Sequence, residues 1–302
     1  MGAAGVGVER FVLADTVVVG VSEKAPAVAT DDFDVLLTAE ADPPPPWVTA
    51  PFADVASAVE RAPVAATVLV HVLRAVEPLA IPVALTVESM GYSMLQRGEG
   101  FRRWSGQRTR RTRRPSAADV VRLERRDGRL DVVLNRPEVH NALNAAMRDA
   151  LVDAFDLVAM DPSISEVHVS GAGASFCSGG DLDEFGLALD VGAAHRLRIA
   201  QSVGRRVHHC CDRVTVHLHG SCIGAGIEIA AFAGRVTARP DTRIRLPELS
   251  MGLIPGAGGT VSVSRRIGRH RTAWLALTGE VLDAGTAQRW GLVDSVVTPA
   301  GC

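Results

Sequence analysis

Aromatic side chains are scarce in this sequence, and charge of neither sign dominates it. Phe, Trp and Tyr together make up 4% of the 302 residues, too few for a surface on which nucleic-acid bases stack. Acidic and basic residues nearly balance, with a formal net charge of −2 at pH 7. Composition therefore points neither to nucleic acid nor to an acidic membrane as a partner.

Cysteine is also sparse, and its spacing forms no recognisable framework. Cys210 and Cys211 are adjacent, so they cannot easily hold one metal ion. The five cysteines are an odd number and match neither a set of disulfides nor a zinc site: Cys177, Cys210, Cys211, Cys222 and Cys302. We expect a protein without a bound metal, in a reducing, cytoplasmic compartment.

Long apolar runs are absent as well. No run reaches the roughly 18 residues that a membrane-spanning helix needs. The N-terminal stretch MGAAGVGVERFVLAD lacks the basic start and the long apolar segment of a secretory signal. We therefore expect neither export nor a membrane partner.

Apolar residues are plentiful enough for a sizeable core, and their pattern changes along the chain. They make up 47% of the sequence, against 22% charged residues, which is typical of a globular protein. Residues 1–53 hold short β-type runs. Residues 54–104 show the apolar spacing of helices, interrupted at Pro78 and Pro82.

From Val120 onward, strand and helix patterns alternate. They include a hairpin turned at Asp127–Gly128 and a long polar helix over residues 191–210. Such alternation is typical of βαβ units, in which helices flank a sheet. We predict an α/β protein with a mostly helical N-terminal appendage, residues 1–117, and a core domain, residues 118–302.

An arginine-rich segment, SGQRTRRTRRPSA, joins the two predicted parts at residues 105–117. Runs of like charge are usually solvated tethers, and we favour that interpretation. A nucleic-acid-binding patch is the alternative, which the low aromatic content disfavours.

Two glycine-rich loops each follow a predicted strand and precede a helix. The first holds Ser178–Gly179–Gly180–Asp181, and the second holds Gly224–Ala225–Gly226. Glycine lets a ligand approach the backbone, whose free N–H groups then point at it. If both loops converge on one point, they form an oxyanion hole.

Two glutamates near the second loop are candidate catalytic groups. Glu228 lies in the first turn of an almost wholly apolar helix, where a carboxylate is costly to bury unless it is paired or functional. Glu248 follows Pro247 in the segment RLPELSMG. Taken alone, Glu248 is equally an ordinary first-turn acid after a proline.

Five motifs in order make residues 120–296 resemble the enoyl-CoA hydratase/isomerase (crotonase) family. They are NRPEVHNALN at 135–144, ASFCSGGDL at 174–182, HGSCIGAGIEIA at 219–230, RLPELSMGLIPGAGGT at 245–260 and LTGEVLDAGTAQRWGLVD at 277–294. The resemblance implies a crotonase-like ββα spiral core in this α/β protein.

The resemblance also implies roles for individual residues. The backbone N–H groups of Gly180 and Ala225 would hold the thioester oxygen of an acyl-CoA. Glu228 would orient and deprotonate water, and Glu248 would deliver a proton to C2. The CoA moiety would lie along His140, Ala142, Ser178, Gly180, Asp181 and Leu182.

The activity implied by the resemblance is enoyl-CoA hydratase, a lyase of fatty acid metabolism that needs no cofactor beyond the CoA of its substrate. The presence of both glutamates favours this activity. An enoyl-CoA isomerase is the nearest alternative, and a non-catalytic, partner-binding subunit is another. Relatives of this kind imply a homo-oligomer, either a trimer or a hexamer.

The sequence departs from the family pattern at both ends. The chain stops eight residues after Asp294, where family members continue with helices that cover the CoA site, and it carries about 117 residues before the core. We expect residues 63–104 to supply the covering helices. The alternative is that residues 10–104 are a degenerate copy of the core unit.

Overall fold

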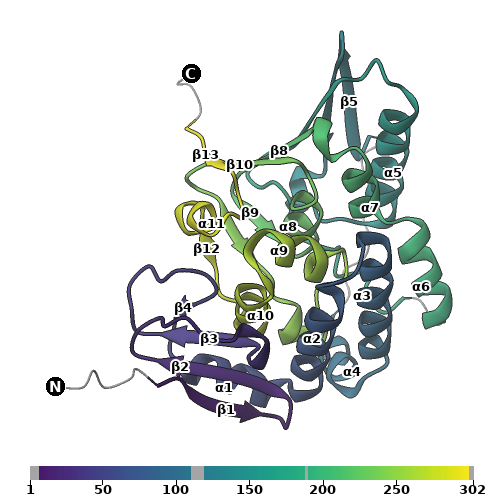
Figure 1. The fold of residues 1–302 in the computed structure, drawn as a ribbon. Coiled ribbons are helices and arrows are strands. Elements are labelled where there is room, and N and C mark those ends of the chain that lie inside the picture. The colour runs from purple at the N-terminus through teal and green to yellow at the C-terminus, as the bar shows by residue number, and fades with distance from the viewer. Residues whose placement is uncertain (1–6, 110–118, 188–189, 299–302) are drawn as a thin grey trace.

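The computed structural model describes residues 7–109, 119–187 and 190–298. In Figure 1 the N-terminal sheet lies at the bottom and the sheet of the core at the top, with helices between them. The predicted arginine-rich linker falls mostly on residues 110–117, which lie outside the described ranges, as does Cys302.

The front of the chain, residues 7–109, begins with a four-stranded sheet. Strands β1 and β2 form an antiparallel hairpin, and β3 and β4 follow in parallel. The bounds are β1 (Glu9–Leu13), β2 (Val17–Ser22), β3 (Val35–Thr38) and β4 (Val48–Thr49). The β-type runs predicted within residues 1–53 are thus confirmed as strands.

Four helices complete the front segment. Their bounds are α1 (Phe52–Arg61), α2 (Pro63–Val76), α3 (Ile81–Gln96) and α4 (Glu99–Gly106). Pro63 and Pro82 occupy first turns, where the missing N–H costs nothing. Helix α2 ends at Val76, just before Pro78, so the predicted breaks are confirmed.

The core is built on a six-stranded sheet of order β13-β10-β8-β7-β6-β5, in which only the β5–β6 hairpin is antiparallel. Asp127 turns the hairpin with φ of 52°, as predicted. A smaller sheet has the order β12-β11-β9. The bounds are β5 (Val121–Arg126), β6 (Arg129–Leu134), β7 (Glu166–Gly171), β8 (Val214–Leu218), β9 (Ser221–Ile223), β10 (Arg235–Ala238), β11 (Arg243–Arg245), β12 (Leu282–Asp283) and β13 (Ser295–Val296).

Helices flank these sheets. Their bounds are α5 (Ala145–Met160), α6 (Val191–Ala200), α7 (Val203–His209), α8 (Ala225–Ala230), α9 (Gly259–Ile267), α10 (Arg269–Thr278) and α11 (Ala284–Trp290), with 3-10 turns η1 (Thr30–Asp32), η2 (Pro137–Val139), η3 (Cys211–Arg213) and η4 (Glu248–Met251). The prediction of one helix over residues 191–210 is wrong. The chain breaks at Ser202, whose hydroxyl caps α7 by accepting from the amide of Arg205 at 3.2 Å.

The front segment and the core domain bury their apolar side chains in one cluster. Helix α2 packs on α9 and α10, α3 packs on α6 and α9, and α4 contacts η4. Two buried arginines of α10 reach into the front segment. Arg269 donates to the carbonyl of Phe33 at 2.7 Å, and Arg271 donates to the carbonyl of Pro43 at 3.1 Å.

Both expectations for the front segment find some support. Its hairpin followed by a parallel strand repeats the arrangement of β5, β6 and β7, which fits a degenerate copy of the core unit. Its helix α3 lines the cavity that Glu228 and Glu248 also line, which fits a covering role.

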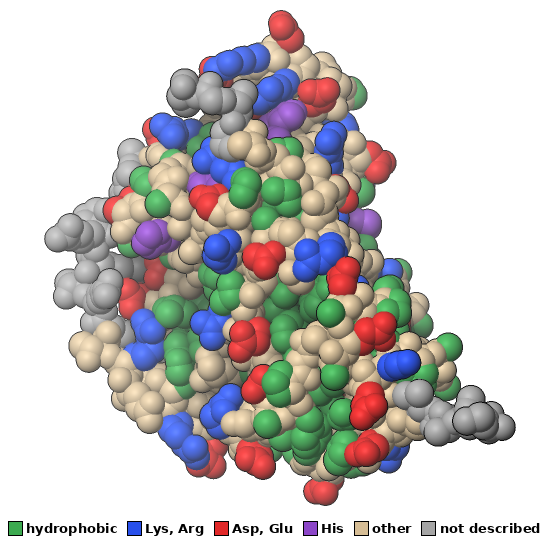
Figure 2. All heavy atoms as spheres, turned by 90° about the vertical axis from the view of Figure 1, so that its left-hand side faces the viewer, with side chains coloured by type: hydrophobic (Ala, Val, Ile, Leu, Met, Phe, Trp, Pro, Cys, Tyr) green, Lys and Arg blue, Asp and Glu red, His purple; other side chains and the backbone are tan. Residues whose placement is uncertain are grey.

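The surface carries charges of both signs. Figure 2 shows acidic and basic side chains interspersed among apolar ones over one face of the molecule. Among the described residues, no single helix has the length and apolar character to cross a membrane. One bent pair, α1 with α2, passes the same test of length and composition, with an angle of 111° between its helices.

Candidate active site

The loop after β7 and the loop after β9 lie against each other. The amide of Ile223 donates to the carbonyl of Cys177 at 2.9 Å, and Cys177 donates to the carbonyl of Ser221 at 3.1 Å. A methyl group added to Gly226 would lie 2.6 Å from the carbonyl oxygen of Cys177. Only glycine permits this approach, which brings the two glycine-rich loops together as predicted.

Two backbone N–H groups with no acceptor among the described residues belong to residues that line the cavity beside these loops. Gly180 and Ala225 both line it, and in the described part of the chain neither amide donates to another residue. Gly224, which precedes Ala225, has φ of 48° and ψ of −122°, a conformation that an L side chain would strain. Two free donors at one cavity are what a developing oxyanion needs.

Glu228 is buried at the side of this cavity, with 2% of its surface exposed. Its Oε2 accepts hydrogen bonds from the amides of Ala257 at 2.8 Å and Gly259 at 2.9 Å. Burial raises the pKa of Glu228 to about 7, although the two amides favour the ionised form. The carboxyl group can therefore accept a proton near neutral pH.

Glu248 begins η4 and faces the same space. A methyl group added to Gly224 would overlap Oε1 of Glu248 and would lie 3.7 Å from Oε1 of Glu228, so both carboxyl groups stand over Gly224. Among the described residues, none donates a hydrogen bond to Oε2 of Glu248. Burial, followed by the charge of Glu228, raises the pKa of Glu248 well above its ordinary value.

The two glutamates therefore differ in how readily they ionise. Glu228 loses its proton first because backbone amides stabilise its charge. Burial and the nearby charge of Glu228 oppose ionisation of Glu248 and raise its pKa. A base and an acid over one cavity can move two protons in one reaction.

The sequence profile of the enoyl-CoA hydratase/isomerase family matches residues 124–301, more than half of the chain. The chain belongs to the enoyl-CoA hydratase/isomerase family. The match includes both glycine-rich loops, Glu228 and Glu248, and its members act on acyl-CoA thioesters.

Individual family members resemble the chain over its core. A 2,3-dehydroadipyl-CoA hydratase of Escherichia coli is 34% identical over 165 residues, which are 55% of this chain and 64% of that protein. A trans-2-decenoyl-[acyl-carrier-protein] isomerase of Streptococcus mutans is 33% identical over 177 residues, 57% and 67% of the two chains. The chain thus spans about two thirds of each relative, and slightly less of the first.

Solved structures of family members agree. Enoyl-CoA hydratases of Thermoplasma volcanium and Mycobacterium smegmatis match with TM-scores of 0.54 and 0.56, at 34% and 31% identity. The matches cover 59% and 60% of this chain and 71% and 70% of those chains. The predicted crotonase-like fold of the core is confirmed.

The residues expected along CoA lie close together but outside the lining of the cavity, Gly180 excepted. Ser178 donates from its amide to the carbonyl of His140 at 2.9 Å, and the carbonyl of Ala142 accepts from Arg136. Asp181 pairs with Arg136 at 3.1 Å. Leu182 packs against the core cluster. The predicted CoA contacts therefore form one strip at the first loop.

The front segment adds a third buried carboxylate that sequence reasoning missed. Glu88 of α3 is 1% exposed and lines the same cavity of about 500 Å³. The signal was present, because Glu88 stands in the apolar helix IPVALTVESMGYSMLQ much as Glu228 stands in its own helix. Glu88 lies outside the residues that the family profile matches.

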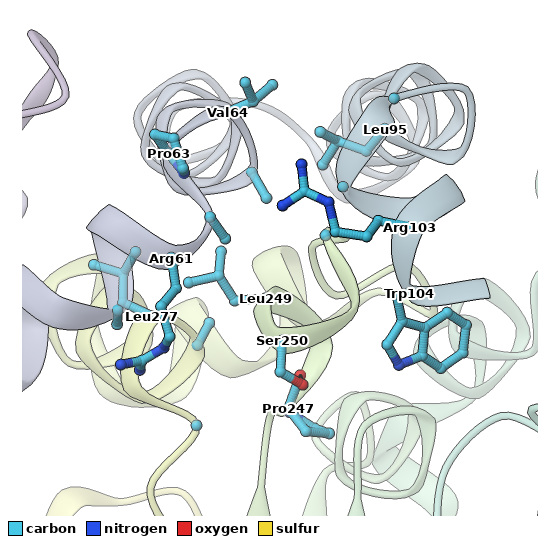
Figure 3. A pocket seen from close by; sticks show the side chains of 18 of the residues that line it. Arg61, Pro63, Val64, Leu95, Arg103, Trp104, Pro247, Leu249, Ser250 and Leu277 are labelled. Atoms are coloured by element: carbon cyan, nitrogen blue, oxygen red, sulfur yellow. Dashed lines mark hydrogen bonds between the residues drawn. The ribbon is translucent and has the colours of Figure 1, made fainter. Parts of the chain in front are cut away.

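A second cavity of about 540 Å³ lies between the front helices and η4. Figure 3 shows Arg61 and Arg103 with apolar side chains such as Leu249 around it. Pro247 and Leu249 line this cavity, whereas Glu248 between them lines the other one. The buried acids and the free amides belong to the first cavity, so we place the chemistry there.

Within the described residues, no group of three or more His, Cys, Asp or Glu side chains could hold a metal ion.

Proposed function

We propose that this chain is an enoyl-CoA hydratase, which adds water across the C2–C3 double bond of a 2-enoyl-CoA thioester. One observation carries the proposal. Two buried carboxyl groups stand together over Gly224, beside two free amides; backbone amides favour the ionised form of Glu228, whereas burial and the charge of Glu228 raise the pKa of Glu248.

The steps follow from this geometry. The amides of Gly180 and Ala225 bind the thioester oxygen. Glu228 removes a proton from water while the water oxygen attacks C3, and the double-bond electrons move onto the thioester as an enolate. Stabilisation of that charge by preorganised donors contributes about 3 kcal/mol per donor. Glu248 then gives its proton to C2, and the thioester carbonyl re-forms.

The stereochemistry follows from the placement of the two acids. Both carboxyl groups stand over Gly224, and we propose that they deliver hydroxyl and proton to the same face of the double bond. The proposed reaction is therefore a syn addition. The proposal includes CoA contacts at His140, Ala142, Ser178, Asp181 and Leu182, no further cofactor, and a cytoplasmic homo-oligomer.

The test is an absorbance assay with purified protein and 2-enoyl-CoA thioesters of several chain lengths. Hydration removes the conjugated double bond, so the absorbance of the enoyl thioester should fall and a 3-hydroxyacyl-CoA should accumulate. Binding of every thioester without turnover would overturn the proposal in favour of a non-catalytic subunit.

An isomerase is the second candidate, because the relative from Streptococcus mutans carries that name. An isomerase needs one group to move a proton between C2 and C4, whereas hydration uses a base and an acid together. The same assay with a 3-enoyl-CoA separates the two. A gain of conjugated absorbance with no hydroxyacyl product would identify an isomerase.

A further inference from the structure

The N-terminal turn of α9 is held by two carboxylates from opposite directions. The amides of residues 257–260 donate in alternation, first to Glu228, then to Glu88, and so on. Gly258 donates to Oε1 of Glu88 at 2.8 Å, and the amide and hydroxyl of Thr260 donate to its Oε2 at 2.9 and 2.7 Å. Residues 257–260, which donate hydrogen bonds to Glu228, are therefore bound by both acids.

Glu88 comes from a segment about 170 positions away in sequence, because the chain separation in these hydrogen bonds is 170 and 172 residues. Its hydrogen-bond partners are amides and one hydroxyl, all neutral groups. A helix cap needs no charge, since Ser, Thr or Asn would serve as well. An acid at this position caps α9 and, once ionised, also adds charge to the cavity.

We propose that Glu88 is a positioning residue of the active site, which fixes the loop that holds Glu228 and adds a third acid to the cavity of Glu228 and Glu248. This inference rests on the proposed hydratase function. Its consequence is that the front segment takes part in setting the working pH of the core, in addition to covering it.

Several other groups face Glu88. Glu228 of α8 is the nearest acid that acts on it, and burial together with the charge of Glu228 raises the pKa of Glu88 to about 8. Tyr92, one turn further along α3, has a pKa raised by burial, so it is neutral here. Arg198 of α6 carries a positive charge that interacts electrostatically with Glu88.

Two of these acids raise the pKa of Glu248, and one cation lowers it. Burial and the charges of Glu228 and Glu88 raise its pKa, whereas Arg245 of β11 lowers it. Glu248 must be protonated to act as the acid, so activity falls as pH rises through its pKa. Removing the charge of Glu88 lowers that pKa, and the basic limb of the pH profile moves to lower pH.

The acidic limb of the pH profile should stay at the same pH when the charge of Glu88 is removed. It reports the ionisation of Glu228, whose pKa is about 7. Glu88, with a pKa of about 8, is still mostly protonated there and exerts little charge. A change in one limb alone separates an electrostatic role from general damage to the fold, which lowers the rate at every pH.

The experiment measures kcat/KM against pH for the full chain and three variants. Glu88→Gln should move the basic limb down by about one pH unit, the size of a like-charge effect between nearby buried groups. Glu88→Asp keeps the charge and should keep the basic limb. Thr86→Val, a matched control two positions before Glu88 on α3, loses a hydroxyl that donates to the carbonyl of Pro82 in the same helix and should also keep it.

The inference would be overturned if the basic limb of kcat/KM in Glu88→Gln lay at the same pH as in the wild type. A rate that falls equally at all pH values, with no movement of the basic limb, would overturn it as well. If Glu88→Gln does not fold, Thr260→Val replaces it. Loss of the hydroxyl donor disfavours the ionised form of Glu88, so its charge should appear at higher pH, and the basic limb should again move down.

Infrared titration of the buried carboxyl groups separates this inference from the hydratase proposal. The carboxyl band of the wild type should lose intensity in steps as pH rises, and in Glu88→Gln the last step should occur at lower pH. If no thioester is hydrated but this shift is seen, the proposed function fails and the role of Glu88 stands. If thioesters are hydrated and the step does not shift, only the role of Glu88 fails.

Discussion

Hydrogen bonds from two amides account for the different behaviour of Glu228 and Glu248. Both carboxyl groups are buried, with 2% and 7% of their surfaces exposed, so burial alone would raise both pKa values. Glu228 has two amide donors on Oε2, and Oε2 of Glu248 has none among the described residues. The first ionised group then opposes ionisation of the second, because like charges repel strongly in a buried site.

The first prediction concerns these two side chains. Glu228→Gln and Glu248→Gln should each lower kcat by about 10²–10⁴, the usual contribution of a positioned acid or base. Binding of a CoA thioester should persist, because the loops and the amides are unchanged. Steady-state kinetics and calorimetry measure both quantities.

Glu124→Gln is the matched control for that experiment, because Glu124 is an exposed acid on β5 that pairs with Arg126. Its kcat should equal that of the wild type. A wild-type rate in either Glu228→Gln or Glu248→Gln would remove that residue from the mechanism.

The buried acids also predict how stability depends on pH. Their ordinary pKa is 4.5, and in the folded chain it is about 7 for Glu228 and about 8 for Glu88. Above pH 4.5 the unfolded chain releases these protons and the folded chain keeps them, so the free energy of unfolding falls as pH rises from about 5 to about 8. The expected loss is on the order of a few kcal/mol.

Urea unfolding at pH 5, 7 and 9 measures this dependence. The Glu88→Gln variant should lose part of the dependence between about pH 5 and pH 8, because one of the titrating groups is gone. A free energy of unfolding that rises from pH 5 to pH 8 would contradict the raised pKa values.

At the scale of elements, α10 is a helix of the core that packs directly against the front segment. Arg269 is 5% exposed and donates to the carbonyls of Phe33 and Thr30, and it lies 3.9 Å from the buried Asp34. Asp34 also pairs with Arg74 of α2 at 2.5 Å. The front sheet, α2 and α10 therefore meet at one polar cluster inside an apolar surrounding.

Arg269→Ala should lower the free energy of unfolding by about 2–4 kcal/mol, because it removes the donor to the buried carbonyl of Phe33 and weakens the pairing of Asp34. Arg289→Ala is the matched control. Arg289 and Asp42 form an exposed pair, with 55% and 71% of their side chains accessible, so its loss should cost less than about 1 kcal/mol. Equal effects in urea unfolding would show that α10 does not depend on Arg269 for docking.

Elements with strong local signals were predictable. Asp127 and Gly128 specify the hairpin of β5 and β6, and Pro82 marks the first turn of α3. The break between α6 and α7 was not, because the apolar spacing continues through it. Ser202 is compatible with a helix interior until its hydroxyl is seen to cap a new one.

At the scale of the whole molecule, the front segment and the core share buried apolar surface. Leu69 and Leu73 of α2 and Leu85 of α3 belong to the same cluster as Ile254 and Val263 of the core. Removal of the front segment would expose the partners of these side chains to water, and a large exposed apolar patch favours aggregation.

A shortened chain that begins at Ser116 should therefore aggregate or lose the oligomeric state of the full chain, and it should lose activity because α3 no longer lines the cavity. Size-exclusion chromatography and the hydration assay measure both. Addition of residues 1–104 as a separate piece should restore part of each. If the front segment is an independent partner-binding module, the shortened chain stays soluble, oligomeric and active.

The sequence by itself determined the family, the two glycine-rich loops, and Glu228 and Glu248 as the candidate acids. These are local features, since a glycine whose φ must be positive, or an acid within an apolar helix, can be recognised from its neighbours. Only the tertiary structure decided that Glu88 joins the same cavity, that its partners are Gly258 and Thr260, and that backbone amides favour the ionised form of Glu228. Those facts depend on burial and on contacts between residues 170 positions apart, which neither spacing nor composition encodes.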